Sequence, residues 1–270
     1  MKLGLLALAA VTLPATLLAQ YRGPRSSDYV FATDAWGARA VWVNPAGLAT
    51  IHEASIMAEV LVERNADGDY PLAQYGFAFN SRGFGFGYRR DRFDDVSGNT
   101  WRLGFGRALP RVALGAALSV YGGEDRQEDF DVGVRWRLTT VVDIAFGAEH
   151  IGQPVVRDSS LRFTGTVGAG WSPLQGLVRV AADARATDLA AAGWLLAYRV
   201  GLRLATPGRR PIALHALLDV DDDFHVTRLV AGLAIGGDYQ GILMGSGARR
   251  GGDSRLETVS LTAVASHRFP

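Results

Sequence analysis

The chain has 270 residues, no Cys, 48% hydrophobic residues and a formal net charge of +1 at pH 7. Without Cys, disulfide bonds, thiolate metal sites and a lipid anchor on an N-terminal Cys are excluded. The balanced charge argues against nucleic acid as a partner, so the pattern of apolar residues becomes the main source of information.

The first twenty residues have the features of a secretory signal peptide. Lys2 precedes an apolar run over residues 3–11, and small residues follow, with cleavage expected after Ala19 or Gln20. Residues 21–52 are predicted to form an N-terminal arm, because residues 21–34 are polar and irregular. After the signal, no run of about eighteen apolar residues remains, so a helical membrane span is not expected.

A short helical turn is predicted where the arm ends. Asn44 can accept hydrogen bonds from free backbone N–H groups, and Pro45 suits the first helical position because it has no N–H to satisfy. We expect this turn to lie at or inside the mouth of a barrel formed by residues 53–270. The alternative is that Asn-Pro is only a common turn dipeptide.

From Glu53 onward, short alternating segments are separated by Gly, Asp, Asn and Pro, which is typical of strands. Their lengths approach the roughly 9–11 residues of a tilted transmembrane strand. We predict an all-β, antiparallel barrel of about fourteen strands: 53–63, 70–80, 84–91, 99–108, 111–121, 127–138, 140–150, 160–171, 176–186, 193–205, 211–220, 223–235, 238–248 and 256–269.

The links between segments alternate in length. Links after even-numbered segments are tight, whereas most links after odd-numbered segments are predicted to be longer, including 64–69, 92–98, 122–126, 151–159 and 249–255. Outer-membrane barrels have short periplasmic turns and longer outer loops. The alternation therefore fits a bacterial outer-membrane barrel with both termini in the periplasm.

Alternation within the segments predicts which face meets lipid. Segment 127–138 sets Phe130, Val132 and Trp136 on one side against Asp131, Gly133 and Arg135 on the other. A soluble sandwich or propeller would show the same alternation with its faces exchanged. The polar side is mostly Gly, Ala, Thr, Ser and Arg, which would leave a soluble core underfilled, so we predict that this side lines a lumen. Segments 223–235 and 238–248 alternate poorly, and their facing stays open.

The short motif before the first strand carries a family resemblance. It consists of Asn44, Pro45, Ala46, Gly47 and Leu48, after a signal peptide and arm and before about fourteen strands. In this arrangement the chain resembles the FadL-like outer-membrane barrels, including the PorV-type branch. The resemblance implies that the N-terminal segment folds into the lumen as a plug, and, for the transporting members, that hydrophobic molecules pass with lateral exit into the membrane. The chain departs from these barrels in its short outer loops and in Pro270 after Phe269.

An excess of Arg among the inward positions suggests two roles for the lumen. The predicted lumenal charges are Arg102, Arg135, Arg137, Arg162, Arg199, Arg203, Asp143 and Asp183. Charges inside a barrel must be hydrated or paired. We favour a lattice of Arg–carboxylate pairs that stiffens the wall and helps to hold the plug. The alternative is a basic passage that receives an acidic head group through bidentate Arg contacts.

No catalytic or cofactor site is expected. The five His residues share no metal-site spacing, no nucleophile elbow is present, and Gly83–Phe84–Gly85–Phe86–Gly87 is followed by no helix that would cradle phosphate. The acidic stretches at 124–129 and 219–223 lack the ligand spacing of a calcium loop and are predicted to be solvated.

Two functions remain open. The first is a barrel, surrounded by outer-membrane lipid, that admits small hydrophobic or amphipathic molecules. The second is a PorV-like barrel that transports nothing and acts as a scaffold or partner in a secretion or envelope complex.

Overall fold

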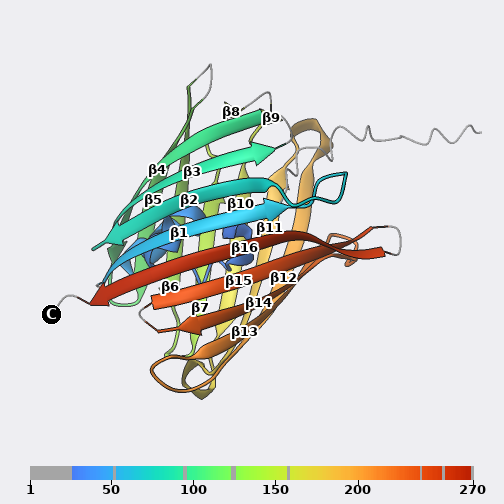
Figure 1. Ribbon diagram of the computed structural model, residues 1–270. Coiled ribbons are helices and arrows are strands. Elements are labelled where there is room, and N and C mark those ends of the chain that lie inside the picture. The colour runs from blue at the N-terminus through green and yellow to red at the C-terminus, as the bar shows by residue number, and fades with distance from the viewer. Residues whose placement is uncertain are drawn as a thin grey trace, which may run out of the picture.

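In the computed structural model, the chain forms a closed β-barrel around a short N-terminal segment (Figure 1). The structure describes residues 26–50, 53–93, 96–122, 126–156, 159–237, 239–250 and 253–268. The expected signal peptide, residues 1–20, lies outside these ranges, as do residues 51–52 and 269–270. Among the described residues, no helix is long and apolar enough to cross a membrane.

Fourteen antiparallel strands close the barrel, as predicted, and each pairs with its neighbours along the wall until β16 returns to β1. Glu53 pairs with Arg268, so the first and last strands meet at one end, which we call the terminal end; the other is the loop end. The strands are β1 (Glu53–Glu63), β2 (Leu72–Ser81), β3 (Phe84–Phe93), β4 (Val96–Ala108), β5 (Val112–Tyr121), β6 (Gln127–Arg137), β7 (Val142–Glu149), β10 (Thr164–Trp171), β11 (Val178–Asp188), β12 (Trp194–Ala205), β13 (Ile212–Asp221), β14 (Val226–Gly236), β15 (Tyr239–Arg250) and β16 (Asp253–Arg268).

Two predictions of outer loops are wrong. Residues 92–98 and 249–255 mostly continue the strands, since Phe93 pairs with Val96 and Arg250 pairs with Asp253. The two hairpins therefore extend the ladder almost to their tips, because antiparallel pairing satisfies the backbone where the sequence alone indicated a polar loop. The link between β7 and β10 is a long loop, and it contains a small hairpin of β8 (Val155–Val156) and β9 (Ser159–Ser160).

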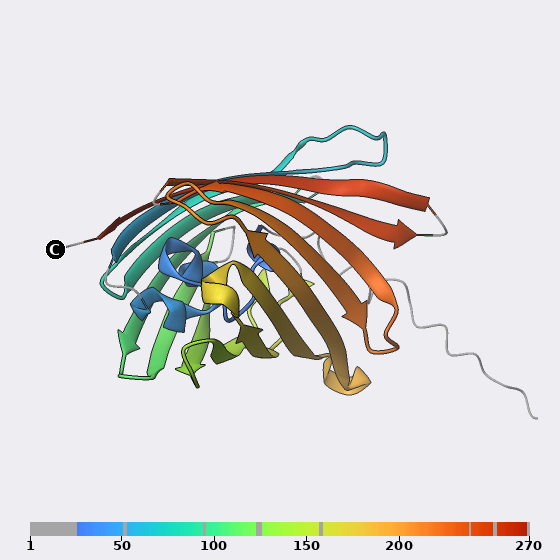
Figure 2. The ribbon, with the colours of Figure 1, turned by 90° about the horizontal axis from the view of Figure 1, so that it is seen from below.

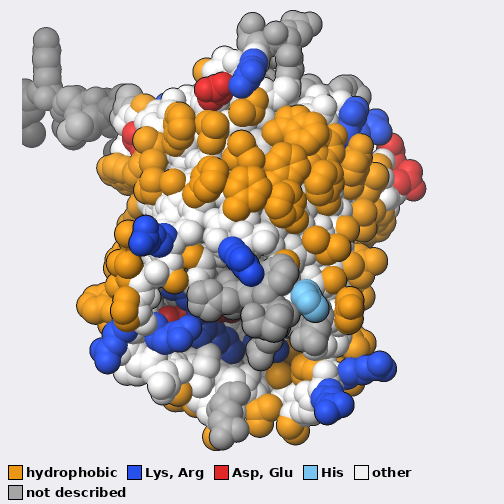
Figure 3. Space-filling model, turned by 90° about the vertical axis from the view of Figure 1, so that its left-hand side faces the viewer, with side chains coloured by type: hydrophobic (Ala, Val, Ile, Leu, Met, Phe, Trp, Pro, Cys, Tyr) orange, Lys and Arg blue, Asp and Glu red, His pale blue; other side chains and the backbone are white. Residues whose placement is uncertain are grey.

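The outer face of the wall is apolar, as the alternation predicts. On β6, for example, Phe130, Val132 and Trp136 are 53%, 45% and 45% exposed, whereas Asp131 between them is 1% exposed. Figure 3 shows apolar side chains forming a broad band across one face of the molecule. Isolated in water, such a surface would be unstable, and in a bilayer it meets hydrocarbon. The exterior is that of a transmembrane barrel.

Aromatic residues are concentrated on one part of this exterior. Phe84, Phe86, Tyr88, Trp101 and Phe105 join with Tyr75, Phe77 and Phe79 into a continuous cluster across β2, β3 and β4, with ring centroids 4.5–6.5 Å apart. Cross-strand register explains the cluster, because Tyr88 pairs with Trp101 and Phe84 pairs with Phe105. The rings thus stabilise the pairing of three neighbouring strands.

The N-terminal segment lies inside the barrel, and Figure 2 shows its short helices enclosed by the strands. It consists of η2 (Ser26–Tyr29), η3 (Gly37–Arg39), α1 (Ala40–Val43) and η4 (Pro45–Ala49). Ala35, Ala40, Val41, Ala46 and Leu48 are 0% exposed. We call residues 26–50 the plug, and the prediction of a short helical plug before the first strand is confirmed.

The lumenal face is more apolar than predicted on one side. Strands β13, β14, β15 and β1 turn a set of apolar side chains inward, against Tyr29 and Phe31 of the plug: Leu61, Leu217, Val230, Ala234, Ile242 and Met244. Both faces of β14 and β15, whose orientation the sequence left open, are therefore apolar. These strands alternate poorly in the sequence because the plug gives their inner face something apolar to pack against.

Candidate functional site

The turn at Asn44 seats the plug against the wall. Asn44 is the N-cap of η4, its side-chain Oδ1 accepts a hydrogen bond from Ala46 N at 3.1 Å, and Pro45 occupies the first helical position. The side-chain Nδ2 of Asn44 donates to the carbonyl oxygen of Phe146 on β7 at 3.4 Å. The same side chain thus caps the turn, as the sequence predicts, and attaches it to the barrel.

Glycines on the wall make room for this turn. A Cβ atom at Gly133 of β6 would lie 1.9 Å from Asn44 Oδ1, and one at Gly115 of β5 would lie 2.2 Å from the carbonyl carbon of Pro45. Leu48 is held in the same way by Gly85 and Gly104, where an added Cβ would lie 2.6 Å from its methyl groups. The glycines that alternate with Phe in the sequence are therefore contact positions for the plug.

Removal of the cap is expected to loosen the plug. Asn44→Ala removes both hydrogen bonds of the buried side chain, which stabilise the folded protein by about 1–2 kcal/mol. Asn44→Ser keeps a short acceptor for Ala46 N and is expected to cost less. Urea unfolding of both variants in detergent micelles measures the difference, and equal stability of Asn44→Ala and the wild type would contradict it.

Polar tethers hold the rest of the plug along the lumen. Tyr29 Oη bonds with Thr258 Oγ1 and donates to Ser246 Oγ at 3.4 Å, and burial raises the pKa of Tyr29. Further along, Ala32 N donates to Asp183 Oδ2 at 3.0 Å, and Ala38 N donates to Ser55 Oγ at 2.7 Å. The predicted lumenal residue Asp183 therefore holds plug backbone.

Half of the eight predicted lumenal charges, Arg102, Arg135, Arg199 and Asp143, take part in ion pairs. Arg135 and Arg179 both contact Asp143, each at 2.8 Å, and Arg179 Nε also donates to Asp34 of the plug at 2.8 Å. Elsewhere on the wall, Arg102 pairs with Asp131, Arg89 pairs with Glu59 at 3.3 Å, and Arg199 pairs with Asp219 at 2.6 Å. These pairs form a lattice of arginines and carboxylates along the wall, and it extends to the plug through Asp34.

Three of the predicted lumenal arginines lie at the margins of the lattice. Arg137 is exposed at the terminal end of β6, Arg162 is half-buried just before β10, and Arg203 donates to the carbonyl oxygen of Gly176 at 3.4 Å. They are not brought together with the paired charges into one basic passage.

A recess remains between the plug and the apolar side of the lumen. It has a volume of about 480 Å³, open mouth included, and its apolar lining comes from Tyr29, Val30, Trp42, Val43, Met57, Ile242 and Met244. Its polar lining comes from the charged or titratable residues Arg39, Glu59 and His215 and from the hydroxyl residues Ser27, Ser260 and Thr262. Trp42 also stacks under the Arg89 guanidinium, whose central carbon lies 4.1 Å from the ring centroid. Burial lowers the pKa of Arg39 to about 10, so its side chain is charged at neutral pH.

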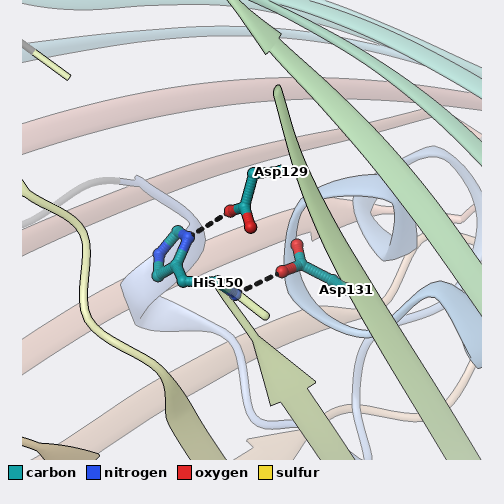
Figure 4. A group of neighbouring side chains, drawn as sticks. All are labelled: Asp129, Asp131 and His150. Atoms are coloured by element: carbon teal, nitrogen blue, oxygen red, sulfur yellow. Dashed lines mark hydrogen bonds and ion pairs between the residues drawn. The ribbon is translucent and has the colours of Figure 1, made fainter. Parts of the chain in front are cut away.

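A second polar group lies at the loop end of β6, where Asp129, Asp131 and His150 meet (Figure 4). His150 Nδ1 lies 2.5 Å from Asp129 Oδ2, and its backbone N donates to Asp131 Oδ1 at 2.7 Å. The three ligand atoms lie within 4.8 Å of one another, a donor set that suits a divalent cation. In this structure, however, the three groups satisfy one another and Arg102, so the cluster fastens the start of the long loop to β6.

This cluster corrects one prediction and was not visible in the sequence. Asp129 belongs to the acidic stretch that we expected to be solvated, yet it is 0% exposed. Alternate inward positions on β6 bury Asp129 and Asp131, and the end of β7 brings His150 beside them. The recess was missed as well, because Arg39 lies in the irregular arm and His215 in an ordinary strand.

Comparisons with known proteins agree with the fold. No protein-family model and no curated protein sequence matches the chain. Among solved structures, it is similar to the toluene transporter TbuX of Ralstonia pickettii, with a TM-score of 0.63 and 11% identity over 94% of this chain and 100% of the other. It is also similar to the monoaromatic hydrocarbon channel CymD, with a TM-score of 0.59 and 11% identity over 92% of this chain and 97% of the other. A Pseudomonas aeruginosa FadL homologue gives a TM-score of 0.50 and 12% identity over 90% of this chain and 96% of the other. At these identities the likeness establishes the fold, which is that of outer-membrane barrels.

Proposed function

We propose that the protein is a bacterial outer-membrane barrel that admits small hydrophobic or amphipathic molecules. The observation that carries the proposal is the recess, which has apolar side chains of β1 and β15 on one side and Tyr29, Trp42 and Val43 of the plug on the other. An apolar cavity with a few polar groups is the usual form of a small-molecule site. Solved barrels with a similar fold are described as a toluene transporter and a hydrocarbon channel, which supports a channel over an enzyme.

The proposal includes the organisation of the chain. Residues 1–20 are proposed to be a signal peptide that is removed on export, residues 21–52 an arm that contains the plug, and residues 53–270 the membrane barrel. Lipid surrounds the apolar exterior. A molecule that enters the recess meets the plug, so passage requires movement of the plug or of the recess wall.

A scaffold without transport is the second candidate, and the tight packing of the plug favours it. The 0% exposure of Val41, Ala46 and Leu48 means that the plug fills its side of the lumen. A closed barrel of this kind presents its exterior and loops to envelope or secretion-complex proteins, as the PorV-type resemblance implies.

Uptake by liposomes that contain the purified protein distinguishes the two candidates. A transporting barrel is expected to raise the influx of a neutral tracer such as toluene above that of protein-free liposomes. Met244→Glu places a carboxylate in the apolar wall of the recess and is expected to lower this influx at least about fivefold, whereas the uncharged Met244→Gln lowers it less. Tracer influx equal to that of protein-free liposomes would refute transport, and specific co-purification of envelope proteins from native membranes would then support the scaffold.

A further inference from the structure

Three buried nitrogen atoms of residues that line the recess have no hydrogen-bond partner among the described residues. They are Arg39 Nη2 and Trp42 Nε1, on the plug, and His215 Nε2, on β13. Buried donors without partners are rare in folded proteins, since each costs free energy unless something accepts its hydrogen bond. Two of them on opposite sides of one recess indicate an acceptor that the protein does not itself supply.

The neighbouring acids are already engaged. Glu59 also lines the recess, but its Oε1 accepts from Arg89 at 3.3 Å and from Gln74 at 2.9 Å. Asp34 is held by Arg179 of β11. Arg39 therefore differs from the lattice arginines Arg89 and Arg199, each of which has a carboxylate within 3.3 Å.

We infer that the recess binds a compact aromatic monoanion, whose carboxylate is held by Arg39 and His215 and whose ring lies among Trp42, Met57 and Met244. The inference rests on the proposed function and names the class of molecule that the site selects. The planar guanidinium suits a carboxylate, and the imidazole of His215 adds one N–H donor at Nε2.

The rest of the recess fits the other end of such a molecule. Sulfur atoms of two methionines beside aromatic rings suit a flat, polarisable ligand. The recess is narrow, since its volume of about 480 Å³ includes open solvent, so only a small ligand can enter it. Arg203 lies near enough to act on both Arg39 and His215, and together with Glu59 these groups leave one net positive charge, so a monoanion is favoured over a dianion.

Benzoate and its neutral isostere benzamide test the inference on the purified, full-length barrel in detergent. Titration calorimetry is expected to show that the wild type binds benzoate at least about tenfold more tightly than benzamide, the ratio that one charge-assisted hydrogen bond provides. Arg39→Gln is expected to remove this preference, because its benzoate affinity falls much further than its benzamide affinity. Arg39→Lys should restore part of it, and His215→Gln should weaken benzoate about threefold or more. Arg137→Gln, at the exposed end of β6, is the matched control and should change nothing.

Each other outcome is decisive. Equal affinity of the wild type for benzoate and benzamide, or an equal loss of both in Arg39→Gln, would overturn the anion site and leave a neutral hydrophobic channel in place. Failure to bind either compound, together with no toluene influx, would overturn the proposed function as well. Gel mobility of the unheated sample shows whether Arg39→Gln is a folded barrel. If it is not folded, His215→Gln must lose the preference for benzoate over benzamide, and an unchanged preference would overturn the inference.

Discussion

Gly133→Ala is expected to push the plug away from the wall and to make the barrel leak. The added methyl group would lie 1.9 Å from Asn44 Oδ1, so either the Asn44 turn or β6 must move. Overpacking of this kind costs about 1–3 kcal/mol, and here it also breaks the cap of η4. We expect a fall of about 2–3 kcal/mol in the free energy of unfolding, together with a higher ion conductance in planar bilayers.

The matched control is the glycine beside it. Gly147 of β7 pairs directly with Gly133, and a Cβ there would have only Thr166 Cβ within 4 Å, at 3.8 Å. Gly147→Ala is therefore expected to change stability by no more than about 0.5 kcal/mol and to leave conductance unchanged. Equal effects of the two substitutions would show that the strands, and not the fit of the plug, respond to the added methyl group.

Asp143→Asn is expected to weaken both the wall and the hold on the plug. Its carboxylate is the shared partner of Arg135 and Arg179, and the three side chains are only 9–18% exposed. Removing one partner of a buried ion pair leaves an uncompensated charge and costs about 3–5 kcal/mol. Since Arg179 also holds Asp34 of the plug, proteolysis of the arm is expected to become faster in this variant.

Two further substitutions separate these effects. Asp219→Asn removes the partner of Arg199 and Arg228, which belong to the wall alone, so it should lower stability without exposing the plug. Asp222→Asn, in an exposed turn, should do neither. Wild-type stability of Asp143→Asn in urea would contradict the role of the ion-pair lattice.

The barrel itself could be predicted from the sequence because lipid and lumen impose opposite demands on successive residues. Along β6 and β12 every second side chain must be apolar, and the turns at Gly83 and Pro110 interrupt the pattern clearly. The Asn44 turn was predictable for a local reason, since a cap needs only its own backbone neighbours.

Features that depend on the plug could not be predicted in this way. Val230, Ile242 and Met244 face inward against Tyr29 and Phe31, contacts between residues about 200 positions apart. The same holds for the recess, because Arg39 and His215 have no sequence relation that marks them as neighbours. The cluster of Asp129 and His150 likewise depends on the register of β6 with β7.

The position of the plug also limits the order in which the molecule is assembled. Residues 26–50 precede every strand, yet Tyr29 bonds to Ser246 and Thr258 on the last two strands, and β16 closes the ring against β1. A segment this tightly enclosed has no route in once the ring is shut. The plug must therefore already lie inside the curving sheet when β16 pairs with β1 and closes the barrel.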